Sequence, residues 1–136
     1  IHHHSLEPDS LFRAELSGAA VQQFAAPQPE EPVYIKHANS AFIGTTLEKD
    51  LRDGGIDTVI VCGATGNHCV ETTARMAGNL GFNTLYVHDA VWTYAATGPD
   101  GHEHSAEEVL SMSLCNLHGE FATVVSTDSV IAQTSR

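Results

Sequence analysis

Strand-like and helix-like segments alternate along this chain from Val33 onward, and this alternation is what most restricts its fold. Short apolar runs typical of buried strands lie near residues 33–36, 57–62, 84–88 and 121–126. Stretches with helical character follow them near residues 46–53, 69–80 and 105–118, and a helical turn ends the chain. Because a helix between two strands carries the chain back to the same edge of a sheet, this order predicts a parallel α/β protein.

The first 32 residues differ from the rest. They hold four of the five prolines and show neither a helical nor a strand period, so residues 1–32 are predicted to be mostly loop. The chain has 136 residues, of which 42% are hydrophobic, enough for one core. A single domain over residues 1–136 is therefore expected.

The net charge of the chain argues against negatively charged partners. Six Lys and Arg face seventeen Asp and Glu, giving a formal net charge of −11, which repels nucleic acid and anionic membranes. The apolar stretches have the length of strands, far short of the ~20 residues of a membrane-spanning helix. We expect a small-molecule substrate and no nucleic-acid or membrane partner.

The three cysteines have no spacing that suits disulfides or a zinc site, so a reducing cytoplasm is expected. Cys62 lies in a strand pattern and Cys115 in a helix pattern, and both are predicted to be buried and inert. Cys69 lies where a strand pattern gives way to a helix. The N–H groups at a helix start favour an ionised thiolate, although a small buried cysteine is the ordinary alternative.

Lys36 ends the first predicted strand, and Cys69 follows the next one. Since ligands of parallel sheets bind beyond the carboxyl ends of the strands, both side chains are predicted to face one crevice. Further motifs occupy the chain as far as residue 90: Ser40-Ala41-Phe42, Gly44-Thr45, Leu47, Leu51-Arg52, Gly55-Ile56, Gly63, Cys69-Val70, Thr73-Ala74, Gly81 and Asp89-Ala90. In order and spacing they resemble the isochorismatase-like cysteine hydrolases, the superfamily that includes nicotinamidases and carbamoylsarcosine amidase.

This resemblance implies a three-layer Rossmann-like fold with a mostly parallel central sheet flanked by helices. It implies a Cys-Lys-Asp triad in which Cys69 is the nucleophile and Lys36 holds the thiolate in place. The N–H groups of Thr65 and Cys69 would form the oxyanion hole, with a cis peptide bond between Ala64 and Thr65. The family's first strand, its helix and the aspartate are not matched, so we expect the aspartate outside these 136 residues.

Four side chains near the predicted crevice are candidates for substrate contact, with core or loop packing as the alternative for each: Phe42, His68, Trp92 and Tyr94. The nicotinamidase metal pattern is not matched by His2, His3 and His4, whose successive side chains point to opposite faces of a strand. We therefore expect no metal, and the role of these three histidines stays open.

The resulting hypothesis is a cofactor-independent enzyme that hydrolyses a C–N bond in a small amide or carbamoyl compound through a thioester. An isochorismatase-type vinyl ether hydrolase is one alternative, and a noncatalytic oligomeric binding module of the same fold is another. The resemblance and the surplus of apolar residues near residues 110–117 also predict a homo-oligomer, a dimer or a tetramer.

Overall fold

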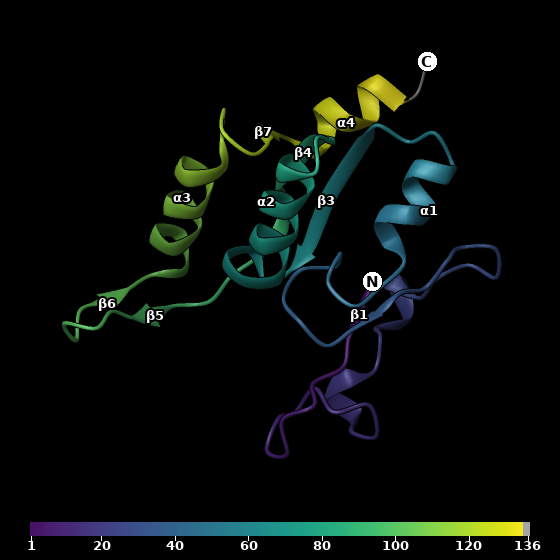
Figure 1. The fold of residues 1–136 in the computed structure, drawn as a ribbon. Helices are drawn as coiled ribbons and strands as arrows, with labels where there is room; N and C mark the ends of the chain where they lie inside the picture. The colour runs from purple at the N-terminus through teal and green to yellow at the C-terminus, as the bar shows by residue number, and fades with distance from the viewer. Residues whose placement is uncertain (135–136) are drawn as a thin grey trace.

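Three parallel strands form the largest sheet in the computed structural model, which describes residues 1–134 (Figure 1). They are β3 (Thr58–Ala64), β4 (Asn83–Trp92) and β7 (Thr123–Val125), with β4 in the middle. Thr58 is in register with Asn83, and Leu85 with Thr123. A second parallel pair joins β1 (His2–His3) to β2 (Ile35–Lys36). The predicted α/β class with a mostly parallel sheet is confirmed.

The helices are α1 (Leu47–Asp53), α2 (Glu71–Asn79), α3 (Ala106–Leu117) and α4 (Thr127–Thr134). A short antiparallel hairpin of β5 (Ala96–Thr97) and β6 (Glu103–His104) precedes α3. The segment before β2 is loop apart from β1 and two single 3-10 turns, Ser17–Ala19 and Gln23–Ala25. It extends away from the three-stranded sheet, and α1 lies on the opposite side of β3 from α3 (Figure 1).

The main core lies between the three-stranded sheet and the helices α2 and α3. Its buried members are Val70, Ala74, Tyr86, Leu117 and Ala122. On α3, Ser113 and Leu117 form the buried stripe, one helical turn apart. Met112 on the same helix is 61% exposed. The expected homo-oligomer stays a prediction.

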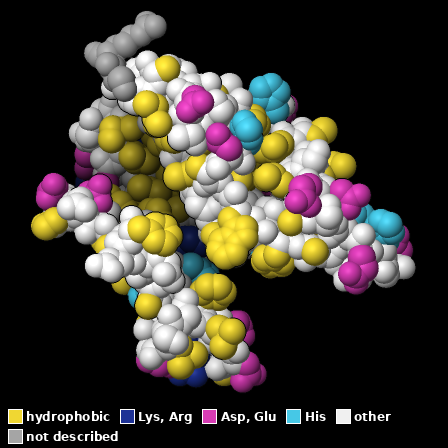
Figure 2. Space-filling model, turned by 180° about the vertical axis from the view of Figure 1, so that it is seen from behind, with side chains coloured by type: hydrophobic (Ala, Val, Ile, Leu, Met, Phe, Trp, Pro, Cys, Tyr) yellow, Lys and Arg dark blue, Asp and Glu magenta, His cyan; other side chains and the backbone are white. Residues whose placement is uncertain are grey.

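An open groove of about 510 Å³ separates β2 from β3. Figure 2 shows it as a hollow walled by hydrophobic side chains, with a basic side chain and a histidine at one end. Its lining runs along β3 from Thr58 to Ala64 and includes Lys36 and Cys69. The groove between β2 and β3 is therefore lined mostly by apolar side chains.

The predicted burial of Cys62 and Cys115 is wrong, since both are exposed. Cys62 lies on β3 and lines the groove. Cys115 lies two residues from both Ser113 and Leu117, which turns it away from the buried stripe of α3.

The helices α3 and α1 begin differently. A capping box begins α3, in which Glu108 N–H donates to Ser105 Oγ and Ser105 N–H donates to the Glu108 carboxylate. The helix α1 begins after Thr46, whose hydroxyl caps no backbone N–H and donates to the Asp50 carboxylate. Across residues 1–134, the helices are too short or too polar to cross a bilayer.

Candidate active site

Lys36 ends β2 with its side chain turned inward, and only 4% of the residue is exposed. Its Nζ donates to the carbonyl oxygen of Ala38 at 2.8 Å and to Cys69 Sγ at 3.1 Å. An ammonium group has three N–H donors, and a third contact joins Nζ to His3 Nδ1 at 3.4 Å. The cation is therefore buried with three acceptors around it, as a buried charge requires.

His3 reaches this lysine because the two strands are parallel and in register. His3 pairs with Lys36 across the β1–β2 ladder, which places both side chains on the same face. An ammonium cannot accept a hydrogen bond, so His3 Nδ1 must be the acceptor, with the ring proton on Nε2. Burial and the charge of Lys36 both lower the pKa of His3 below 6.5, which favours this neutral form.

Cys69 lies in a π-helical turn, Gly66–Val70, which leads directly into α2. The wide turn is defined by bonds that span five residues, from Val70 N–H to Thr65 O and from Glu71 N–H to Gly66 O. Cys69 Sγ also lies 3.9 Å from Asn39 Oδ1. Among residues 1–134, no carboxylate hydrogen-bonds to Cys69 or Lys36. The proton acceptor of the implied triad stays a prediction.

The peptide bond between Ala64 and Thr65 is cis, at the position that the resemblance indicates. Thr65 directly precedes the π-helical turn, and its carbonyl oxygen accepts from the N–H groups of His68 and Val70. Thr65 and Cys69 thus flank the same turn at its start and near its end. Their role as oxyanion donors remains a prediction.

The four proposed substrate contacts fall into two groups. Phe42 lines the groove together with Lys36 and Cys69, and its ring stacks on Phe82 with centroids 5.9 Å apart. His68 and Tyr94 meet edge to face at 5.9 Å, and the hydroxyl of Tyr94 lies 3.4 Å from His68 Nδ1.

Trp92 completes the second group at the end of β4, in register with Ala64 and 74% exposed. It joins His68 and Tyr94 outside the groove lining, so these three contacts stay predictions.

Sequence reasoning did not assign His3 or Asn39 to the site. The histidine run was visible, but its pairing with Lys36 depends on the register of two strands that lie more than 30 residues apart, and one sequence does not reveal that register. Asn39 follows Lys36 by three residues in a loop, where spacing carries no directional information.

The arrangement is suited to nucleophilic chemistry at Cys69. Lys36 Nζ places a positive charge beside Cys69 Sγ, and a neighbouring cation stabilises the ionised sulfur. The pair opens into the largely apolar groove, in which electrostatic interactions are less screened than in bulk water. Such a site can attack an electrophilic carbon of a small substrate.

Comparison with known proteins shows the family of the chain. Residues 3–129 match the isochorismatase domain family. An uncharacterised isochorismatase family protein of Bacillus subtilis is 41% identical over 131 residues, which cover 96% of this chain and 70% of that protein. The N-carbamoylsarcosine amidase of an Arthrobacter species is 32% identical over 124 residues, which cover 91% of this chain and 43% of that enzyme.

The structural comparison gives the same result. A crystal structure from Chromobacterium violaceum, of a protein assigned to the isochorismatase family of hydrolases, matches with a TM-score of 0.94 and 41% identity. The match covers 98% of this chain and 69% of that one. With the family match spanning nearly the whole sequence, we conclude that this chain belongs to the isochorismatase family of hydrolases.

Proposed function

We propose that the protein is a cysteine hydrolase that cleaves a C–N bond of a small amide or carbamoyl compound through a thioester at Cys69. The observation that carries this proposal is the contact of 3.1 Å between Lys36 Nζ and Cys69 Sγ at the groove. Lys36 is almost fully buried and holds its ammonium group against the sulfur of Cys69, where a positive charge supports negative charge on a nucleophile.

In the proposed reaction the sulfur lone pair of Cys69 forms a C–S bond to the substrate carbonyl carbon. The C–N bond then breaks and the amine leaves with a proton. Water attacks the thioester, a C–O bond forms, and the C–S bond breaks to return the thiolate beside Lys36. The resemblance assigns the proton transfers to the aspartate of the triad. The chemistry calls for no cofactor.

The surroundings of the site support a small, partly apolar substrate. Phe42 contributes an aromatic wall to the groove. His68 and Tyr94 place polar atoms next to the nucleophile turn, where they are suited to contact a carbonyl or amide group. The similarity to an N-carbamoylsarcosine amidase favours carbamoyl compounds among the candidates.

A substrate panel with matched cysteine variants tests the proposal. The panel contains small primary amides, carbamoyl compounds and isochorismate, and the variants are Cys69→Ser and Cys115→Ser. We expect Cys69→Ser to lose at least ~100-fold in kcat on the active substrate, because a hydroxyl ionises far less readily than a thiol. Cys115→Ser changes the same atoms at an exposed position and should retain activity.

Mass spectrometry during turnover distinguishes the alternatives. The thioester route predicts an acyl adduct on the peptide that contains Cys69. Full activity of Cys69→Ser on isochorismate would contradict covalent catalysis and support the vinyl ether hydrolase instead. Substrate binding without turnover in the parent protein would support the noncatalytic module.

A further inference from the structure

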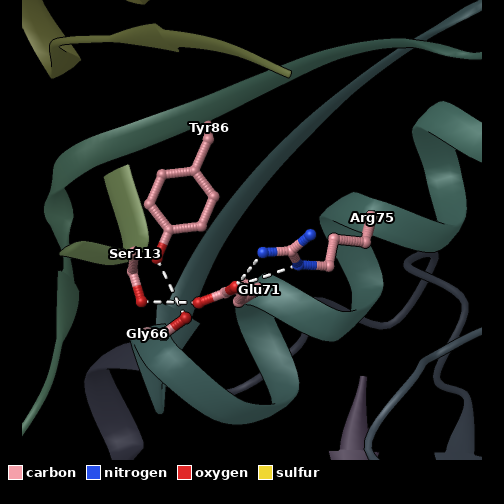
Figure 3. A network of polar contacts seen from close by, with 5 residues as sticks. All are labelled: Gly66, Glu71, Arg75, Tyr86 and Ser113. Atoms are coloured by element: carbon pink, nitrogen blue, oxygen red, sulfur yellow. Dashed lines mark hydrogen bonds and ion pairs between the residues drawn. The ribbon is translucent and has the colours of Figure 1, made fainter. Parts of the chain in front are cut away.

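The carbonyl oxygen of Gly66, at the start of the π-helical turn, accepts two hydrogen bonds. One comes from the backbone N–H of Glu71, which is the bond that gives the turn its π width. The other comes from the hydroxyl of Tyr86 on β4, at 3.0 Å (Figure 3). Tyr86 is fully buried, so its hydroxyl has no bulk water to bond to and depends on this acceptor.

The fit between Tyr86 and Gly66 is close. A Cβ at residue 66 would lie 3.1 Å from the Tyr86 hydroxyl and 3.0 Å from Thr93, so a larger residue would force these neighbours to move. Burial, with a smaller contribution from the charge of Glu71, raises the pKa of Tyr86 to about 12. The hydroxyl therefore keeps its proton and remains a donor at any working pH.

The other end of the turn is held by a second set of polar contacts. Glu71, the first residue of α2, accepts two hydrogen bonds from Arg75 at 2.9 and 2.7 Å and one from Ser113 on α3 at 2.5 Å. Figure 3 shows these side chains converging behind the turn, between α2 and β4. The Arg75 guanidinium in turn lies over the ring of Phe121, 4.6 Å from its centroid.

Cys69 lies between these two anchored residues. We propose that Tyr86 and Glu71 are positioning residues, which hold the nucleophile turn at both ends and so keep Cys69 Sγ within reach of Lys36 Nζ. Neither side chain touches Cys69. They act through the Gly66 carbonyl and through the first residue of α2. This inference rests on the proposed role of Cys69 as the nucleophile.

The geometry explains why such support is needed. A π-helical turn is rare in proteins and often occurs at functional sites. Here it exists because Gly66 O and Thr65 O accept from residues five positions later. If the turn relaxed to α-helical winding, its residues would rotate about the helix axis. The 3.1 Å contact of Cys69 with Lys36 would then lengthen.

Tyr86→Phe tests the proposal, with Tyr34→Phe as the matched control, in a parent that carries Cys62→Ser and Cys115→Ser. Tyr34 also donates a hydroxyl hydrogen bond, to Asp50, but away from the turn. The readouts are the rate of Cys69 alkylation by iodoacetamide across a pH series and the thermal midpoint. We expect Tyr86→Phe to slow alkylation of Cys69 at neutral pH by roughly threefold, because Lys36 Nζ would then lie farther from the sulfur.

A purely structural role predicts a different result. Tyr86→Phe would then lower the thermal midpoint, while the rate of Cys69 alkylation at each pH would equal that of the parent. This outcome would overturn the proposal. If Tyr86→Phe does not fold, Ser113→Ala decides in the same way, because it removes a donor from Glu71 at the other end of the turn. A separate measurement shows whether the proposed role of Cys69 as the nucleophile is wrong. In that case Cys69 would react with iodoacetamide no faster than Cys62 in the unmodified protein.

Discussion

The two halves of the candidate active site come from parts of the molecule that are held together differently. Cys69 belongs to the half built from β3, β4, β7, α2 and α3, where Ala74, Tyr86 and Leu117 have no exposed surface. Lys36 belongs to the half built from β1, β2 and the long segment between them, where Phe24 is 91% and Leu6 75% exposed. The nucleophile is thus positioned by a packed core, and the lysine by a few polar contacts.

This difference implies that stability and site geometry respond separately to substitution. Substitutions in the packed core that supports Cys69 remove buried apolar contacts and should lower the free energy of unfolding. Changes around Lys36 remove few apolar contacts, and they act on the free energy of unfolding through one buried charge, whose acceptors are single atoms on Ala38, His3 and Cys69.

The largest expected difference between the halves is in leucine packing. Leu117→Ala removes a fully buried side chain from the core, and large-to-small core changes of this kind cost about 2–5 kcal/mol. Leu11→Ala makes the same change at a residue that is 74% exposed, and should stay within about 0.5 kcal/mol. Urea unfolding measures both. Equal losses would mean that the first 34 residues form a core of their own.

Helix capping gives a smaller difference of the same kind. Ser105→Ala removes the side-chain cap of α3 and should lower the free energy of unfolding by about 1 kcal/mol. Thr46→Ala precedes α1 and removes a hydroxyl that caps no backbone N–H but donates to Asp50 at the surface, so it should cost less than about 0.5 kcal/mol. A cost at Thr46 as large as that at Ser105 would contradict this distinction.

The smallest expected effect concerns pH. Because the pKa of His3 is lowered in the folded state, the unfolded chain binds the proton more readily. This group therefore leaves the free energy of unfolding unchanged above the unfolded-state pKa of about 6.5, and reduces it as the pH falls through the lower folded-state value. Protonated His3 also cannot accept from Lys36.

We expect the acid-induced loss of stability to be smaller in His3→Gln than in the parent protein. His102→Gln, a change at an exposed residue of the loop between β5 and β6, serves as the control. Urea midpoints on both sides of neutral pH make the comparison. An unchanged acid slope in His3→Gln would show that the ring is already protonated beside Lys36, or that it lies elsewhere.

Much of the fold could be predicted because local patterns determine it. The helix of residues 105–118 was found within one residue at each end, since Ser105 and Glu108 form a cap that the sequence displays directly. The turn that bears Cys69 was predicted as the start of a helix and is a π-helical turn before α2. Its width depends on the Glu71 N–H bond and on Tyr86, and Tyr86 reads in the sequence as one more residue of an apolar strand.

The sequence predicted the part of the candidate site that depends on where the strands end. The motif spacing brought Lys36, Cys69 and Phe42 to one place, and the structure lines one groove with all three. Cys62 was misjudged because an apolar strand pattern implies burial only where other elements cover both faces of the strand, and Cys62 lines the open groove instead. The contact of His3 with Lys36 depends on strand register, which a single sequence does not contain.

The contact between Lys36 and Cys69 is the central claim, and competitive alkylation of the three cysteines tests it most directly. Cys62 and Cys115 are exposed and Cys69 is only partly so, so access alone predicts that Cys69 reacts slowest.

We expect the opposite order at neutral pH, with Cys69 modified by iodoacetamide roughly three- to tenfold faster, because the ammonium group of Lys36 lies 3.1 Å from its sulfur. Lys36→Met should abolish this advantage, whereas Lys49→Met, at an exposed lysine paired with Asp53, should preserve it. Equal labelling of all three cysteines would contradict an activated nucleophile at Cys69, and an advantage that survives Lys36→Met would contradict the role of the contact with Lys36.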